Sequence, residues 1–212
     1  MNLPNKLTIF RIFLVPIMVL IPYLGFNEEV FGIPMYLILV DIIFIIASIT
    51  DKLDGTIARK KNLVTDFGKF LDPIADKILV IAALIILVDL EKIPSWIPII
   101  VIFREFLVSG FRLVAASKGG KVIAASIWGK IKTLTQMIAI VLAFIDKFNF
   151  ADFIWRVKSK EEAIVSTVGI YMTMPEYCLN IIASLLLIVS VIATIISGID
   201  YLKSGKEYLK DK

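Results

Sequence analysis

Four aspartates recur at helical spacings in one short stretch of the chain. They are Asp51, Asp54, Asp72 and Asp76. In a helical conformation the first two share one face with Gly55 and Ala58, and the last two share one face with Gly68. Two neighbouring antiparallel helices would therefore direct all four carboxylates to the same end of a helical bundle. A single aspartate at a helix start is more often a cap or part of a solvated loop, but four on two matched faces favour a shared site.

Four carboxylates in one place repel each other unless protons or cations intervene. At about 6 Å and an effective dielectric constant near 20, each pair costs roughly 3 kcal/mol. Two divalent cations would balance the four charges, and ligand sets made of oxygen atoms favour Mg²⁺ or Mn²⁺. Such a pair of ions stabilises both the attacking and the leaving oxygen at a phosphorus centre. The small residues Gly55 and Ala58 would let a ligand lie against the helix that bears them.

The composition restricts which other chemistry the chain can perform. It has 212 residues, of which 58% are hydrophobic and 20% are charged, and its mean hydropathy is +0.88. It contains no histidine and a single cysteine, Cys178, which excludes disulfides within the chain, thiolate zinc sites, Ser-His-Asp triads and histidine-ligated metals. Catalysis must therefore depend on carboxylates, lysine, tyrosine or cations bound by oxygen. The net charge of +4 gives no support for nucleic-acid binding and favours contact with an anionic membrane surface.

Long apolar stretches predict the elements that carry these residues. A helix that spans a membrane needs about 20 mostly apolar residues, and six stretches approach that length. They are residues 7–27, 30–50, 71–88, 93–116, 127–145 and 177–199. The sequence therefore predicts an all-α integral membrane protein with six transmembrane helices, in a single membrane domain that covers residues 1–212.

The basic residues are distributed unequally between the two sides of this arrangement. Of 23 Lys and Arg residues, 17 lie on the side of the two termini and five on the other side, while Arg104 lies within a span. The positive-inside rule then places both termini in the cytoplasm, so a site on residues 51–76 of this multi-pass plasma-membrane protein would face the cytoplasm. The connection of about residues 146–175 would lie outside, where its mixed charge and apolar stretch predict an amphipathic or interfacial segment.

Residues 51–76 follow the pattern D-x2-D-G-x2-A-R-x8-G-x3-D-x3-D without a departure. This pattern resembles the signature of the CDP-alcohol phosphatidyltransferase family. The resemblance implies a six-helix membrane domain, usually a homodimer, that transfers a phosphatidyl group from a CDP-linked lipid to an alcohol and releases CMP. It also implies that Asp51, Asp54, Asp72 and Asp76 bind two metal ions and that Asp76 is the general base for the acceptor hydroxyl. The residues expected at the CDP site are Gly55, Ala58 and Arg59, with Asn5, Thr8 and Arg11 nearby.

Three further segments, residues 4–11, 104–112 and 129–133, resemble the bacterial branch of this family whose acceptor is glycerol 3-phosphate. The activity expected from this resemblance uses CDP-diacylglycerol and glycerol 3-phosphate and gives phosphatidylglycerol phosphate and CMP, a step of phospholipid biosynthesis. Two metal ions, Mg²⁺ or Mn²⁺, would assist attack of the acceptor hydroxyl on the lipid-side phosphate.

A small dianion such as glycerol 3-phosphate needs cations at the cytoplasmic interface. The candidate residues for its phosphate are Arg104, Arg112, Ser126, Lys130 and Lys132. The two arginines lie eight residues apart on one helical face, whereas Lys132 turns away from Lys130 by about 200°. An intramembrane arginine is a functional candidate by default. Alternatively, Arg104 forms an ion pair with Glu105 of a neighbour or with Asp41, and the lysines attract anionic lipid.

Two alternatives remain open from the sequence. A sibling enzyme of the same family would use inositol phosphate, serine or phosphatidylglycerol as its acceptor. A cation transporter based on membrane carboxylates would instead place its acids near the middle of a helix, as Asp41 is placed. The signature aspartates stand at predicted helix ends, which favours the enzyme.

Overall fold

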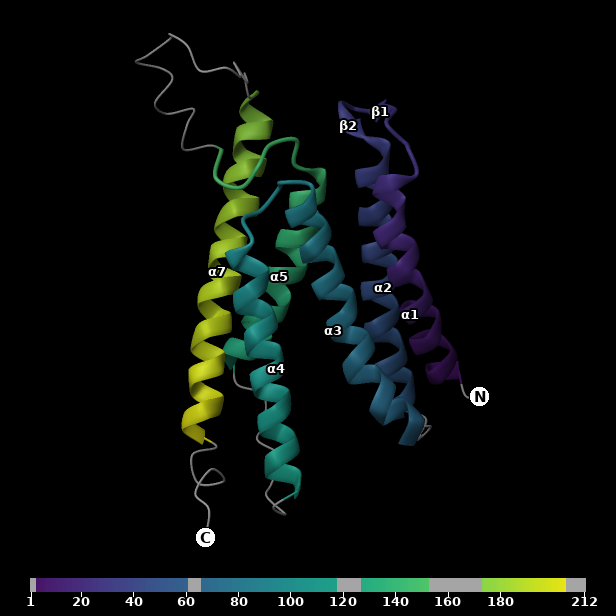
Figure 1. Cartoon of the computed structure of the whole chain (residues 1–212), viewed down its shortest axis with the longest axis vertical. Coiled ribbons are helices and arrows are strands. Elements are labelled where there is room, and N and C mark those ends of the chain that lie inside the picture. Colours follow the sequence, from purple (N-terminus) through teal and green to yellow (C-terminus); the bar gives the residue numbers. More distant parts are fainter. Residues whose placement is uncertain (1–2, 61–65, 118–126, 153–172, 205–212) are drawn as a thin grey trace. The chain divides into compact units, whose positions relative to one another are not determined.

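A computed structural model describes residues 3–60, 66–117, 127–152 and 173–204 of the chain. These residues are mostly helical, which confirms the all-α prediction. Each of the six predicted spans overlaps one long helix. These helices are α1 (Leu3–Leu20), α2 (Met35–Lys60), α3 (Asp66–Asp89), α4 (Trp96–Ser117), α5 (Ile127–Ile145) and α7 (Met174–Ser204) (Figure 1).

Three of the described helices are long and apolar enough to cross a membrane by length and composition. They cover Asn5–Tyr23, Ile127–Ile145 and Met174–Lys203. The chain is thus a helical membrane protein. The other three long helices carry charges, such as Asp41 in α2 and Arg104 in α4, so the count of six spans and the orientation of the termini stay predictions.

The helices form two compact units. The N-terminal unit contains residues 1–92 and 141–149, and the C-terminal unit contains residues 93–140 and 150–212. This division does not test the prediction of a single membrane domain over residues 1–212, which stays a prediction.

In the N-terminal unit, α1 packs against both α2 and α3, which also contact each other. Figure 1 shows that the start of α1, the end of α2 and the start of α3 lie at the same end of this unit. The buried face of α1 repeats every three or four residues, at Asn5, Thr8, Arg11, Val15 and Met18. Both halves of the aspartate signature are thus on helices that the fold brings to one end.

A short hairpin connects α1 to α2 and corrects two predicted helix boundaries. After α1 the chain forms a 3-10 helix (Ile21–Tyr23), and then β1 (Glu29–Val30) pairs with β2 (Ile33–Pro34). The turn residues Phe31 and Gly32 have φ angles of 55° and 72°, the left-handed pair that a two-residue hairpin turn requires. The second helix therefore begins at Met35 and not at Val30, and the first helix ends before residue 27.

The end of α3 is fixed by its own backbone and by the end of α5. The amide of Lys92 donates to the carbonyl of Leu87 at 2.8 Å, and the amide of Glu91 donates to the carbonyl of Val88 at 2.9 Å. With Glu91 at φ 57°, these bonds form the Schellman motif that ends many helices. The Lys92 ammonium then donates to the backbone carbonyl of Asp146 at 2.6 Å, within the same unit.

In the C-terminal unit, α4 packs along α7, and the two helices run in the same direction (Figure 1). Glu176 accepts hydrogen bonds from the amide and the hydroxyl of Thr173, both at 2.8 Å, which caps the start of α7. Small polar residues are buried along α7, and such residues let membrane helices approach closely. They are Asn180, Ser184, Ser190, Thr194 and Ser197. The predicted external segment 146–175 lies mostly outside the described residues.

Candidate functional site

Arg11 and Asp51 join α1 to the first half of the aspartate signature. The Arg11 Nη1 atom lies 2.5 Å from Asp51 Oδ1. The arginine side chain is buried, whereas the aspartate side chain is 34% exposed. Asn5 and Thr8 lie on the same buried face of α1 as Arg11. The structure therefore brings Arg11 to the first aspartate of the signature, and its place near the CDP site stays a prediction.

The other signature residues are placed by their backbone alone. Asp54 lies in α2, and Asp72 and Asp76 lie in α3, in the helical conformation that the spacing predicted. Their side chains, and those of Gly55, Ala58 and Arg59, lie outside the part of the chain whose side chains are described. Among the side chains that are described, no three acidic or cysteine residues gather as a metal site would require. The predicted dimetal site thus stays a prediction.

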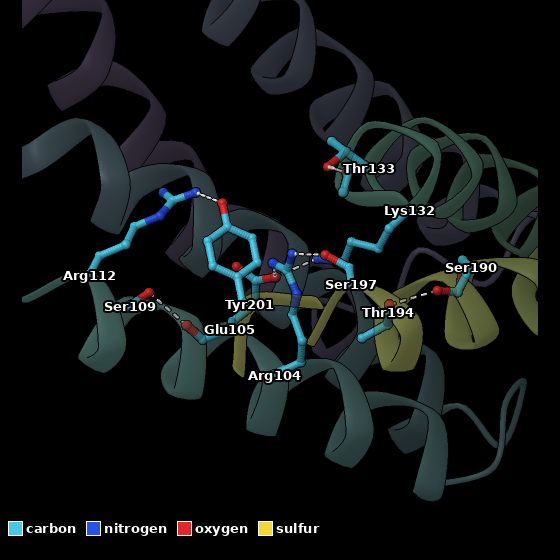
Figure 2. Close-up of polar contacts among 11 residues, drawn as sticks. Arg104, Glu105, Ser109, Arg112, Lys132, Thr133, Ser190, Thr194, Ser197 and Tyr201 are labelled. Atoms are coloured by element: carbon cyan, nitrogen blue, oxygen red, sulfur yellow. Dashed lines mark hydrogen bonds and ion pairs between the residues drawn. The ribbon is translucent and has the colours of Figure 1, made fainter. Parts of the chain in front are cut away.

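A second polar site joins α4, α5 and α7 in the C-terminal unit (Figure 2). The Glu105 carboxylate holds two cations on one oxygen, since Oε1 lies 2.7 Å from Arg104 Nη1 and 2.6 Å from Lys132 Nζ. Arg104 also donates through Nη2 to the Ser197 hydroxyl at 2.5 Å. The three charged side chains are 8–16% exposed, so most of this ion pairing is shielded from water. Arg104 therefore pairs with the adjacent Glu105 of its own chain, and its binding of the acceptor phosphate stays a prediction.

Arg112 belongs to the same site through Tyr201. Its Nη2 atom donates to the Tyr201 hydroxyl at 2.6 Å, and its guanidinium carbon lies 5.3 Å from the centre of the ring. The guanidinium carbon of Arg104 lies 5.7 Å from the same ring centre. Both distances are within the range of cation–π attraction. Figure 2 shows the tyrosine ring between the two arginines.

We call these six side chains the basic cluster: Arg104, Glu105, Arg112, Lys132, Ser197 and Tyr201. Three cations face one carboxylate within it, which leaves a formal charge of +2. Of the cations, Arg112 is exposed, whereas Lys132 is buried. The cluster can therefore attract an anion, and Arg112 is the cation that an anion from the aqueous side can reach.

The remaining acceptor candidates are not part of this cluster among the described residues. Lys130 is exposed on α5 while Lys132 is buried, which confirms that these two lysines point to different sides of the helix. Ser126 lies outside the described residues. Sequence reasoning missed Tyr201 and Ser197, although their spacing of four residues in the last turns of α7 places two polar groups on one face.

The sequence profile of the CDP-alcohol phosphatidyltransferase family matches residues 1–196, which include most of both units. The chain belongs to this family. Its members generally depend on metal ions. Family membership therefore favours the enzyme over the cation transporter, and it gives the aspartate signature its expected context.

Several curated relatives in this family are similar over most of their length. A Bacillus subtilis protein, 50% identical over 156 residues that cover 70% of this chain and 79% of the relative, is named CDP-diacylglycerol–glycerol-3-phosphate 3-phosphatidyltransferase. A Haemophilus influenzae protein of the same name is 43% identical over 143 residues, which cover 66% of this chain and 73% of the relative. A Mycobacterium tuberculosis protein named probable phosphatidylglycerophosphate synthase is 40% identical over 141 residues, 66% of this chain and 65% of the relative.

Proposed function

We propose that this chain transfers the phosphatidyl group of CDP-diacylglycerol to glycerol 3-phosphate, giving phosphatidylglycerol phosphate and CMP in phospholipid biosynthesis. The names of the relatives from Bacillus subtilis and Haemophilus influenzae support this activity. The observation that carries it in the structure is the basic cluster with its formal charge of +2. A phosphate monoester carries a charge of about −1.5 to −2 at pH 7, which the cluster matches.

The charge of the basic cluster also favours some of the possible acceptor alcohols over others. Serine has no phosphate, and the phosphodiester of phosphatidylglycerol carries a single negative charge, so neither needs two uncompensated cations. Arg112 presents a planar guanidinium, which suits two oxygens of one phosphate. Inositol phosphate is also a monoester and stays the competing acceptor within the family.

The donor half of the reaction is assigned to the signature end of the N-terminal unit. Carboxylate oxygens from α2 and α3 are the donor set that Mg²⁺ or Mn²⁺ prefers, and Arg11 orients one of these carboxylates, Asp51, by its hydrogen bond. When bound, two such ions would neutralise the four aspartates and polarise the phosphate oxygens. The CDP group would lie along Gly55, Ala58 and Arg59, with Asn5, Thr8 and Arg11 nearby.

Asp76 acts on the acceptor in this proposal. Its carboxylate takes the proton of the glycerol 3-phosphate hydroxyl as the hydroxyl oxygen bonds to the lipid-side phosphorus, and the bond from that phosphorus to the CMP oxygen breaks. A carboxylate next to cations is a weak base, so Asp76 must act through its position more than through its strength.

The membrane arrangement completes the proposal. Both termini and the signature end would face the cytoplasm at the plasma membrane, where glycerol 3-phosphate is available and CMP can be released. The whole chain would act as one family domain, since the family profile extends across residues of both units. We further propose a homodimer, as is usual in this family.

A panel of acceptors tests the proposed function. The purified protein would be supplied with labelled CDP-diacylglycerol, Mg²⁺ and one alcohol at a time: glycerol 3-phosphate, inositol phosphate, serine or phosphatidylglycerol. We expect CMP release and a labelled phosphatidylglycerol phosphate product with the highest kcat/KM for glycerol 3-phosphate. A higher kcat/KM for another alcohol would assign the chain to a sibling activity.

A further inference from the structure

Tyr201 of α7 contacts both arginines of α4, Arg104 and Arg112. It lies in the last turns of α7, four residues after Ser197, which accepts a hydrogen bond from Arg104. The side chain of Tyr201 is buried, with 2% of its surface exposed. A buried tyrosine normally needs a partner for its hydroxyl group, and here that partner is Arg112. Tyr201 thus has a fixed position from which it can hold a more exposed residue.

The guanidinium of Arg112 contacts Tyr201, and the Arg112 residue is also exposed. Among the described residues, its hydrogen bond to the Tyr201 hydroxyl is the contact that fixes its guanidinium, together with the ring at 5.3 Å. The guanidinium has five N–H groups, and this hydrogen bond uses one of them. The remaining N–H groups can bind two oxygens of a phosphate, while the tyrosine keeps the planar group from rotating.

The ring of Tyr201 also lies close to Arg104, with 5.7 Å between the guanidinium carbon and the ring centre. Two guanidinium groups near each other repel, and the electron-rich faces of an aromatic ring offset part of this repulsion. Arg104 is neutralised by Glu105 and bound by Ser197. The arrangement therefore leaves Arg112 as the positioned cation of the pair (Figure 2).

We infer that Tyr201 is a positioning residue that sets the guanidinium of Arg112 for the phosphate of the acceptor alcohol. The inference rests on the proposed function, because it assigns a role in binding glycerol 3-phosphate. Tyr201 acts through Arg112 and does not touch the reacting atoms. Removing its hydroxyl therefore weakens acceptor binding without changing how CDP-diacylglycerol binds.

Tyr201→Phe tests the inference because it removes the hydroxyl and keeps the ring. We expect KM for glycerol 3-phosphate to rise about three- to tenfold, the size of one hydrogen bond. The values of kcat and of KM for CDP-diacylglycerol should stay within twofold of wild type. Tyr201→Leu, which removes the ring as well, should raise KM for glycerol 3-phosphate further. If the leucine variant does not fold in detergent, the phenylalanine variant alone decides.

The matched control is Tyr23→Phe. Tyr23 also donates its hydroxyl in a hydrogen bond, to Asp89 Oδ2 at 2.7 Å, but it belongs to the N-terminal unit. We expect both KM values of this variant to equal those of wild type. An unchanged KM for glycerol 3-phosphate in Tyr201→Phe, or an equal rise of both KM values, would overturn the inference.

A double-mutant cycle separates positioning from a general structural role. If Tyr201 acts only through Arg112, Tyr201→Phe should add no further rise of KM for glycerol 3-phosphate in an Arg112→Ala background. Additive effects of the two substitutions would contradict the inference. The two proposals fail in different ways. A wild-type protein that does not transfer to glycerol 3-phosphate refutes the proposed function, whereas an active wild type with an unaffected Tyr201→Phe variant refutes only the role of Tyr201.

Discussion

Each unit of the protein buries an ion pair that contains a residue expected to bind substrate. Arg11 pairs with Asp51 in the N-terminal unit, and Glu105 pairs with Arg104 and Lys132 in the C-terminal unit. Removing one partner of a buried ion pair lowers the free energy of unfolding by more than the intact pair contributes to it, because the remaining charge is left without a counter-charge. These residues can therefore be tested through stability as well as through activity.

The Arg11–Asp51 pair predicts a metal-dependent stability. Arg11→Met should lower the unfolding temperature in the presence of a chelator, because it leaves the Asp51 carboxylate without its cation. We expect the free energy of unfolding to fall by about 1–3 kcal/mol. This is less than for a fully buried pair, because the Asp51 side chain is one-third exposed. Saturating Mg²⁺ should restore part of the loss if Asp51 binds a metal. The measurement is thermal unfolding in detergent with chelator and with Mg²⁺.

Lys6→Met is the control for this experiment, since Lys6 is an exposed cation of the same helix. It should change the unfolding temperature little under either condition. If Mg²⁺ raises the unfolding temperature of Arg11→Met no more than that of Lys6→Met, Asp51 is not a metal ligand.

Metal dependence should also appear in catalysis through Asp72. Asp72→Asn keeps the size of the side chain and removes its charge, so it should abolish phosphatidyl transfer while the protein still elutes as a folded species in detergent. Wild-type activity should disappear in excess chelator and return with Mg²⁺ or Mn²⁺. Full activity in excess chelator would refute the two-metal proposal.

Arg112 should determine the affinity for the acceptor. Arg112→Ala should lower kcat/KM for glycerol 3-phosphate roughly ten- to hundredfold, the cost of losing a charge-assisted hydrogen bond to an anion. KM for CDP-diacylglycerol should change little, and Arg112→Lys should recover only part, because a point charge does not bind two oxygens as a guanidinium does. Steady-state kinetics with each substrate varied in turn provides the test.

Lys203→Ala serves as the control for Arg112, since it removes an exposed cation in the last turn of α7. It should leave both KM values unchanged. A lower yield of Arg112→Ala with both KM values unmoved would mean that Arg112 only anchors its helix to anionic lipid. Equal weakening for both substrates would indicate a distorted site.

At the scale of elements, apolar runs predicted where the long helices lie but not where they begin. Residues 30–50 read as one apolar segment, yet the helix starts at Met35. The first residues of that segment form a hairpin because Phe31 and Gly32 adopt left-handed angles and Pro34 cannot donate a backbone hydrogen bond. Hydrophobicity is the same in a membrane helix and in such a hairpin, so the turn chemistry decides the boundary.

Contacts between helices were harder to predict from the sequence than the helices themselves. The spacing of Arg104 and Arg112 placed both arginines on one face of α4, and both do contact α7. Their partners, Ser197 and Tyr201, lie about 90 residues away, and no local pattern connects two segments at that distance. Glu105 is shared by two cations because the packing of α5 brings Lys132 to the same carboxylate oxygen that Arg104 contacts, and this packing is not visible in the sequence.

The backbone angles of the hairpin and of α4 predict opposite effects for two glycine substitutions. Gly32→Ala should destabilise the protein by about 1 kcal/mol, because its φ of 72° strains any residue with a Cβ atom. The added Cβ would also lie 2.8 Å from Lys147 Nζ, but that flexible end can move. Gly110 lies in the interior of α4, and beyond its chain neighbours and the helix's own backbone an added Cβ would meet no atom within 4 Å. Gly110→Ala should therefore stabilise the protein by about 0.5–1 kcal/mol.

Thermal unfolding of the two glycine variants in detergent, next to wild type, provides the measurement. Gly25→Ala is a further comparison, since its φ is 80° with open space around the added Cβ. It should destabilise about as much as Gly32→Ala if the backbone angle is the cause. If Gly32→Ala loses much stability and Gly25→Ala does not, the contact of the added Cβ with Lys147, and not the backbone angle, causes the destabilisation.

At the scale of the whole molecule, the water-soluble acceptor and product belong to a different phase from the lipid donor. Glycerol 3-phosphate and CMP are ionic and stay in water, whereas the acyl chains of CDP-diacylglycerol stay in the bilayer. The reacting groups can therefore meet only at an interface, which agrees with aspartates in the second half of α2 and the first half of α3. Charge distribution in the sequence predicts that this interface is the cytoplasmic one.

Cysteine labelling tests that orientation. The native Cys178 is exposed and would react itself, so the experiment starts from Cys178→Ser. In this background, Lys60→Cys reports on the signature segment and Lys147→Cys reports on the connection after α5. With a maleimide that does not cross membranes, Lys147→Cys should react in intact cells, whereas Lys60→Cys should react only after the membrane is permeabilised. The expectation follows from 17 basic residues on the side of the termini against five on the other. A Lys60→Cys variant that reacts in intact cells would place the aspartate signature outside the cytoplasm, away from its proposed soluble substrate, and the predicted topology would be wrong.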